Sequence, residues 1–465
     1  MTRFWEFVHS PFHNKHKKVR LLVTYLRKIH PDFNIKKLNT TTLLDQFAEY
    51  ESFDEQELTL TFTYTLRLFY DFNAKKILDE ENIILNKLLT LQGLRKNEQT
   101  RLYQKFHRGI QLPATEKGSK YYHTAFALAA EENNFFGQNP SRENQTLLIK
   151  KQVALDHFYF VEKIKDACEM LIRSQILKVP FDINMLDAVI TEIDAQPTLY
   201  ADNPVITSYL AIYKLLSTND LSQYDDTLKL VLAEEKHLPN DELKGIYNYL
   251  QNFCIRQINS GHSHFLAALF YIYEQQLERN LLHNGAYLSE FHLKNIVTVG
   301  LRLKRYEQVL AYMNTYHQLL DPSIAANAQK YNLANYYYAT QQYEAVIEQL
   351  QQVEYTDIRY NLDAKSLLLR TYFELNEEVA LFSLFEAFRQ FLKRNSKVSD
   401  DQKRGYLNLM KITKQAFVLK INMPYQSHGQ CQKQLNRIKK NMEEKTPIFN
   451  RDWLQEKVSL LEVQI

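Results

Sequence analysis

Residues 330–353 read KYNLANYYYATQQYEAVIEQLQQV, and this stretch predicts two helices joined by a tight turn. In its first half, Leu333, Ala334 and Tyr337 share one face of a helix. Gln341 and Gln342 then interrupt the apolar pattern. The second helix is marked by an apolar stripe made of Tyr343, Val346, Ile347, Leu350 and Val353. Because a single helical hairpin cannot bury both of its faces, we expect the unit to recur along the chain.

The pattern does recur, both upstream and downstream of this stretch. One position of the first helix recurs in five successive units, and we call it the anchor. The anchors are Tyr209, Phe253, Ile296, Leu333 and Leu368, which are separated by 44, 43, 37 and 35 residues. A period of this length is typical of proteins built from stacked helix pairs. The sequence therefore predicts a helix-pair repeat array over residues 201–440.

The quoted segment also resembles a tetratricopeptide repeat. The matching positions are Leu333, Ala334, Tyr337 and Tyr343. The segment departs from that family where Val346 replaces a small residue, and in the preceding unit Gly300 replaces an aromatic residue. The resemblance is clearest over residues 287–390 and implies a right-handed α-α superhelix, in a family whose members mostly act as adaptors. The whole chain also resembles uncharacterised bacterial helical-repeat proteins, which implies no particular function.

The composition predicts an all-α fold. The chain has only ten glycines and eleven prolines in 465 residues, whereas strands and tight hairpins depend on both. We expect a small helical N-terminal domain at residues 1–115 and a connecting region with a long helix at residues 116–200, which alternatively supplies the first helix pair. The repeats at residues 201–440 are followed by a capping helix at residues 441–465, and the first joint is predicted near LPATEKGSK at residues 112–120.

Several features predict a cytoplasmic protein without a membrane span. The longest apolar run, FLAALFYIY at residues 265–273, is about half of the roughly 20 residues that a spanning helix needs. The N-terminal sequence has no uninterrupted apolar segment of the secretory type. Cys168, Cys254 and Cys431 are far apart and odd in number, which is typical of a reducing compartment and of no metal site.

The sequence lacks the motifs of common enzymes. No two glycines lie closer than nine residues apart, which excludes the glycine-rich phosphate loops and the nucleophile elbow. The spacing of Glu234 and His237 is that of a di-iron bundle, but such a site needs two of these motifs and only one is present. We therefore predict no catalytic residues, no metal and no cofactor.

A binding surface is predicted on the first helices of the repeats. Asn252, Asn295 and Asn332 each precede an anchor position in three successive units. In tetratricopeptide arrays the first helices line a concave groove, and the resemblance implies that amides and cations there bind an acidic, extended peptide. The predicted groove residues are Lys294, Asn295, Arg302, Tyr331, Asn332, Asn335, Tyr338 and Arg370. The alternative is that the asparagines are structural amides between helices.

Charge distribution supports a second interpretation. The net charge is only +3, but basic residues gather near both ends of the chain. These residues are Lys15, Lys17, Lys18, Arg20, Arg27, Lys28, Lys433, Arg437, Lys439 and Lys440. They predict either solvated helix faces or contacts with nucleic acid or an acidic protein. The expected partner is thus a protein or peptide bound by a scaffold, and the alternative function is that of a nucleic-acid-associated regulator.

Overall fold

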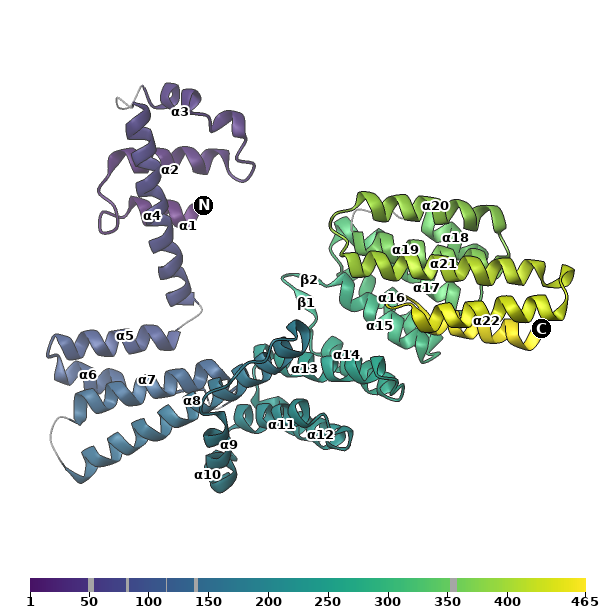
Figure 1. Cartoon of the computed structure of the whole chain (residues 1–465). Coiled ribbons are helices and arrows are strands. Elements are labelled where there is room, and N and C mark those ends of the chain that lie inside the picture. The colour runs from purple at the N-terminus through teal and green to yellow at the C-terminus, as the bar shows by residue number, and fades with distance from the viewer. Residues whose placement is uncertain (49–53, 81–82, 114, 138–140, 352–357) are drawn as a thin grey trace. The chain divides into compact units, whose positions relative to one another are not determined.

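The structure is a computed structural model that describes residues 1–48, 54–80, 83–113, 115–137, 141–351 and 358–465. These residues form helices α1 to α23, five short 3-10 helices and one two-stranded hairpin (Figure 1). The all-α class is therefore confirmed. In the part of the chain that is described, no helix is both long and apolar enough to cross a membrane. Contacts divide the chain into two compact units, Met1–Ile246 and Tyr247–Ile465.

The first unit begins with three helices that pack against a fourth. These are α1 (Thr2–His9), α2 (Lys17–Ile29), α3 (Thr40–Phe47) and the long α4 (Glu55–Glu80). Phe4, Val8, Val19 and Val23 are buried between α1 and α2, and Leu68 and Phe72 of α4 close this cluster. The sequence begins α3 with a capping residue, since the Asn39 side chain accepts a hydrogen bond from the backbone N–H of Thr42 at 2.8 Å.

The rest of the first unit is organised around a helix of 36 residues. The helices are α5 (Ile83–Lys96), α6 (Thr100–His107), α7 (Ser119–Phe136), α8 (Arg142–Leu177), α9 (Leu186–Ala195), α10 (Pro197–Tyr200), α11 (Pro204–Thr218), α12 (Tyr224–Glu234) and the first turns of α13 (Asn240–Asn259). The long helix α8 packs against both α7 and α11. Its stripe of Val161, Ile164 and Cys168 is buried, which explains why these apolar residues recur at helical spacing.

The second unit consists mostly of consecutive helix pairs. After α14 (Phe265–Glu278) and the hairpin of β1 (His283–Asn284) and β2 (Tyr287–Leu288), the elements are α15 (Glu290–Arg302), α16 (Tyr306–Tyr316), α17 (Pro322–Ala339), α18 (Tyr343–Gln351), α19 (Ile358–Leu375), α20 (Glu378–Arg394), α21 (Asp400–Asn422), α22 (His428–Glu444) and α23 (Arg451–Gln464). Helix α17 packs against α15, α18 and α19, so the first helices of three pairs lie in succession.

The turn predicted at Gln341 and Gln342 lies between α17 and α18. Gln341 has a φ of +60°, and the backbone N–H of Gln342 donates to the Tyr337 carbonyl at 2.8 Å, which closes the first helix. The core of this pair and its neighbour is formed by Tyr331, Ala334, Val346, Leu350, Ala364 and Leu367. Val353, the last residue of the predicted stripe, lies outside the described residues.

Gly300 explains one departure from the tetratricopeptide pattern. It lies on α15 where a side chain would collide with Val309 of α16 and Phe270 of α14. Phe270 is fully buried and occupies the space that an aromatic side chain at position 300 would need. The close approach of α14, α15 and α16 therefore requires glycine at this position.

Candidate binding groove

Helices α15, α17 and α19 each present one face to a cavity of about 780 Å³ in the second unit. The lining residues from these helices include Lys294, Thr298 and Arg302 of α15, Tyr331, Asn335 and Tyr338 of α17, and Asp363, Ser366 and Arg370 of α19. Within each helix they lie three or four residues apart, as expected for side chains on one helical face. We call this cavity the groove.

The opposite side of the groove is formed by the start of α23 and by Tyr406 of α21. The rings of Tyr406 and Phe449 stack with their centroids 4.3 Å apart. Asn450 lies at the N-cap position of α23, but its side chain makes no capping bond. Instead, its Nδ2 donates to Ser366 Oγ at 2.6 Å and attaches the start of α23 to α19.

Glu374 joins three helices at this edge of the groove. Its carboxylate accepts from the indole N–H of Trp453 at 3.2 Å and forms an ion pair with Lys457 at 2.9 Å. The phenol of Tyr338 also donates to it, at 3.5 Å. Glu374 and Lys457 are both largely buried, with side-chain exposures of 14% and 13%. The contacts hold α23 in place as a wall of the groove rather than as a cap remote from it.

The structure brings six of the eight predicted groove residues to this one cavity. These six are Lys294, Arg302, Tyr331, Asn335, Tyr338 and Arg370. Asn295 does not line it; this residue is exposed, and its side chain hydrogen-bonds Tyr273. Asn332 is only 1% exposed, and its Oδ1 has no hydrogen-bond partner among the described residues. The recurring asparagines therefore do not form a row of equivalent positions.

The positive charge of Lys294 is balanced within the groove by a neighbouring carboxylate. Its ammonium forms an ion pair with Asp363 and lies 5.3 Å from the ring centroid of Tyr331 and 5.2 Å from that of Tyr360. Both the carboxylate and the ring faces attract a cation, so this charge is held in place by the protein itself. Lys294 therefore contributes more to the shape of the groove than to its capacity for an incoming anion.

Arg370 and Arg302 are different from Lys294. The guanidinium carbon of Arg370 lies 4.6 Å from the ring centroid of Tyr338, and its Nε has no hydrogen-bond partner in the described structure. Burial raises the pKa of Tyr338, with Arg370 opposing and Glu374 adding to this effect, so the phenol is protonated at neutral pH. Arg302 is exposed and has no ion-pair partner among the described residues. Because the Nε of Arg370 is itself buried, an anionic ligand would be bound by the terminal guanidinium nitrogens of Arg370 and by the exposed guanidinium of Arg302.

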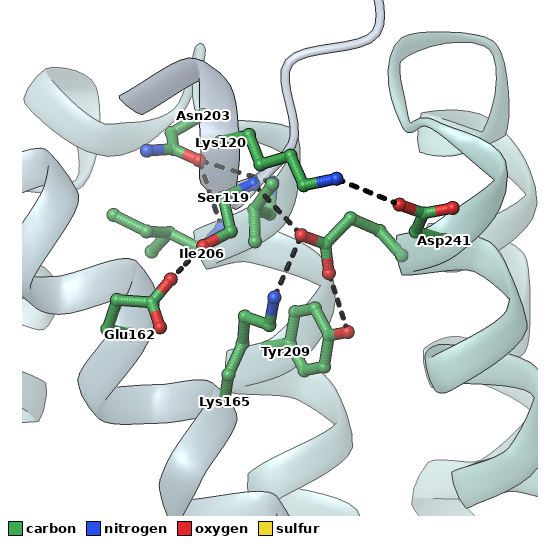
Figure 2. A network of polar contacts seen from close by, with 10 residues as sticks. Ser119, Lys120, Glu162, Lys165, Asn203, Ile206, Tyr209 and Asp241 are labelled. Carbon is green, nitrogen blue, oxygen red and sulfur yellow. Dashed lines mark hydrogen bonds and ion pairs between the residues drawn. The ribbon is translucent and has the colours of Figure 1, made fainter. Parts of the chain in front are cut away.

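A second polar cluster lies in the first unit (Figure 2). Unlike the arginines of the groove, its central side chain has its hydrogen bonds made within the protein. Glu242, at the start of α13, is only 5% exposed. Its Oε1 accepts from the backbone N–H of Ser119 at 2.9 Å and from Lys165 Nζ at 2.8 Å, and its Oε2 accepts from the Tyr209 hydroxyl at 2.8 Å. Both carboxylate oxygens are thus engaged by the protein. We call these four residues the Glu242 cluster.

The Glu242 cluster fixes the start of α7 to α13. The Ser119 hydroxyl donates to Glu162, whose pKa is raised mainly by burial. Two residues earlier, the backbone N–H of Lys117 donates to the His237 carbonyl at 2.8 Å. At Gly118 a Cβ would lie 2.6 Å from the ring of Pro239, so only glycine permits this approach. The predicted joint at residues 112–120 is therefore attached, at its end, to the start of α13.

The basic residues of the alternative prediction occur in both units. Lys18 forms an ion pair with Glu57 at 2.7 Å, and Arg20 donates to the Asn14 carbonyl at 2.7 Å. Lys439 pairs with Glu462 at 2.6 Å and Lys440 with Glu444 at 3.6 Å. The guanidinium of Arg27 lies 4.8 Å from the Trp5 ring. The remaining residues of the set, which are exposed, are Lys15, Lys17, Lys28, Lys433 and Arg437.

Sequence reasoning missed the residues that α23 brings to the groove. Trp453 lies within the capping helix predicted at residues 441–465, where nothing in the sequence assigns it to the groove, and Glu374 and Asn450 belong to no motif. A tryptophan beside a charged helix start is a weak signal, although the chain has only two tryptophans. In the described ranges, no group of three or more His, Cys, Asp or Glu side chains is placed to hold a metal ion. No family model, curated protein or solved structure matches this chain.

Proposed function

We propose that this chain is a non-enzymatic scaffold whose tetratricopeptide-like helix pairs form a right-handed superhelix and bind an extended, acidic protein segment in the groove. The observation that carries the proposal is the pair of arginines, Arg302 and Arg370, which line the groove and form no ion pair among the described residues. The succession of α15, α17 and α19 along one cavity supports the repeat architecture.

The charges of the groove favour an acidic ligand. The cationic lining residues are Lys294, Arg302, Lys304, Arg370 and Arg451, and the acidic ones are Asp363, Asp452 and Glu456. Asp363 is already paired with Lys294, and Glu456 contacts Lys457 at 3.0 Å. A carboxylate of the ligand would form paired hydrogen bonds with a guanidinium group, and Tyr338 would add apolar contact with a fixed ring.

The aliphatic hydroxyls of the lining support a binding role rather than catalysis. Thr298 donates to the Lys294 carbonyl at 2.8 Å, as is common for threonine within a helix. Ser366 Oγ accepts from Asn450 and so is used in the attachment of α23. Both hydroxyls therefore take part in hydrogen bonds within the protein.

The proposal is tested by selection from a display library of random peptides, with the full chain as bait. We expect enrichment of acidic sequences, which are then synthesised and titrated by fluorescence anisotropy. Arg302→Ala/Arg370→Ala should weaken binding at least about tenfold, because each change removes charge-assisted hydrogen bonds. The matched control is Arg389→Ala, which changes an exposed arginine of α20 that pairs with Glu386.

The same experiment includes an arm for the alternative function. Lys15, Lys17 and Lys18 line a cavity of about 480 Å³ together with Tyr64, an arrangement suited to a phosphate backbone with a stacked base. A labelled single-stranded oligonucleotide is titrated at low and high salt, with Lys15→Glu/Lys17→Glu as the variant. Enriched peptides that bind the arginine double variant as tightly as the wild type would refute the groove, and salt-sensitive oligonucleotide binding would favour the alternative.

A further inference from the structure

Helix α4 has two apolar faces, and only one of them is covered. On the covered face, Leu58, Thr61 and Thr65 are buried against α2 and α3, and Leu68 and Phe72 pack on the cluster around Phe4. The other face carries large apolar side chains that remain exposed. They are Phe62 (38% exposed), Leu66 (49%), Phe69 (42%), Tyr70 (61%) and Ile77 (51%). Phe69 lies at the border of the two faces, since its ring also packs edge-on against Phe4 with the centroids 5.3 Å apart. We call this second face the α4 stripe.

The spacing of the α4 stripe is that of a helix-pairing seam. Phe62, Leu66 and Phe69 follow one another at four and three residues, and Ile77 continues the same side two turns later. Side chains of this size, each about half exposed, offer on the order of 500 Å² of apolar surface. That is near the upper limit of the largest patches on monomeric proteins, so a covering partner is expected.

The polar residues within the α4 stripe do not oppose its burial. The Thr59 hydroxyl donates to the Glu55 carbonyl at 2.9 Å, and the Asn73 Nδ2 donates to the Phe69 carbonyl at 2.7 Å. Their donors are thus satisfied by the helix that carries them. A partner covering this face would leave neither of these donors without an acceptor.

We propose that the α4 stripe is the contact between two copies of this chain, with their α4 helices antiparallel. The charges along α4 determine the direction. Glu55 lies in the first turn, and Lys76 lies near the end of the helix, beside the stripe, where it contacts Glu80 at 3.9 Å. Because Glu80 also pairs with Arg3 of α1, the charges at this end remain positive in sum. Antiparallel pairing places Glu55 of one copy near Lys76 of the other on both sides of a twofold axis, whereas parallel pairing places like charges together.

Two copies also suit the size of the surface. The stripe of one copy and that of the other together bury on the order of 1,000 Å² of apolar surface, and flanking side chains add to this. This area lies at the lower end of that of specific interfaces, so we expect a dimer that dissociates on dilution. The proposal concerns the first unit and does not depend on what the groove binds.

The test measures the mass of the full chain in solution by light scattering and sedimentation, from about 1 to 100 µM. We expect the wild type to approach the mass of a dimer at the highest concentration. Leu66→Glu should raise the dissociation constant at least about tenfold, because it places a charge in the seam. The matched control is Leu60→Glu, since Leu60 lies on the same helix and is equally exposed at 50%, but on a different face.

A charge exchange tests the direction of pairing without adding a charge to the apolar centre. Glu55→Lys should weaken the dimer, and Glu55→Lys/Lys76→Glu should restore it, since the attraction between the two ends is then re-formed with opposite signs. A wild type that stays monomeric over the whole range, a Leu66→Glu variant that still dimerises like the wild type, or a double exchange that fails to restore the dimer would each overturn the proposal.

Discussion

The Glu242 cluster and the groove both gather charged side chains and tyrosine between helices, but they differ in how their hydrogen bonds are completed. At Glu242, both carboxylate oxygens accept bonds from Ser119, Lys165 and Tyr209. In the groove, Arg370 stacks on Tyr338 but leaves its Nε without a partner among the described residues. The first arrangement is complete within the protein. In the second, the unpaired Nε is itself buried, and it is the exposed Arg302 whose donors remain available.

This difference separates polar residues that hold the fold from those that are available to a ligand. A buried group whose bonds are all made within the chain is costly to remove and has nothing left to offer. A guanidinium group at a cavity with unused donors costs the fold little to lose, but determines what the cavity accepts. Substitutions in the two regions should therefore have opposite effects on stability and on binding.

The largest expected effect on stability is at Glu242. Glu242→Ala should lower the free energy of unfolding by about 3 kcal/mol, because it leaves Lys165 and the Tyr209 hydroxyl without their shared acceptor. Urea unfolding followed by circular dichroism measures this loss. In a Trp5→Phe background, Trp453 fluorescence reports on the second unit, and its transition should not move.

The neighbouring residue provides the control for this prediction. Asp241 pairs with Lys120 at 3.8 Å, and both side chains are almost fully exposed. Asp241→Asn should therefore change the free energy of unfolding by no more than about 0.5 kcal/mol. Equal losses at positions 241 and 242 would remove the distinction between a buried, completed cluster and a solvated ion pair.

A smaller effect is expected from His157, which lies beside Asn203 in the first unit. Its Nδ1 is 3.0 Å from the Asn203 amide, and burial lowers the pKa of His157 below its ordinary value of 6.5. The fold therefore favours the neutral ring, so the contribution to stability is complete above pH 6.5. It is lost as the pH falls from 6.5 through the lowered pKa, because the unfolded chain binds the proton first.

His157→Phe isolates this contribution, since it retains an aromatic ring against Tyr122 but cannot be protonated. Urea titrations of both proteins between pH 7.5 and 5 should show that the wild type loses stability more steeply on acidification than the variant does. Parallel curves would contradict the prediction, because they would mean that the ring is solvated in the folded protein.

The smallest effect is expected at Asn332, the amide that the sequence placed in the groove. Its Oδ1 is buried and lacks a partner among the described residues, so the native protein already bears the cost of an incomplete hydrogen bond. Asn332→Leu, of similar volume, should leave the free energy of unfolding unchanged or raise it by about 1 kcal/mol. Thermal unfolding checks this, and a loss of more than about 1 kcal/mol would indicate that the amide is structural.

The helical class and the local hairpins were predictable because they depend on neighbouring residues. Scarce glycine and proline indicated helices, and the polar break at Gln341 and Gln342 coincides with the turn after α17. The spacing of Lys294 and Arg302, which is about two helical turns, likewise follows from a single helix. These signals are local, and the periodicity of a helix is enough to reveal them.

The remaining features depend on contacts between distant residues. Ser119 and Glu242 are 123 residues apart, and Asn450 and Ser366 are 84 apart, so no local pattern marks either pair. From the sequence alone, Glu242 cannot be distinguished from a solvated residue in the first turn of a helix. The environments of Asn295 and Asn332 also differ, although each precedes an anchor, because neighbouring helices cover only the second.

The position of α23 as a wall of the groove has a consequence for synthesis. Arg302, Tyr338 and Arg370 are translated before the residues that complete their cavity, and Trp453 follows Arg370 by about 80 residues. At common translation rates this interval lasts roughly 4 to 16 seconds. During that time the helix pairs are present without the last wall of the cavity, so the complete groove should form only after α23 has left the ribosome and docked.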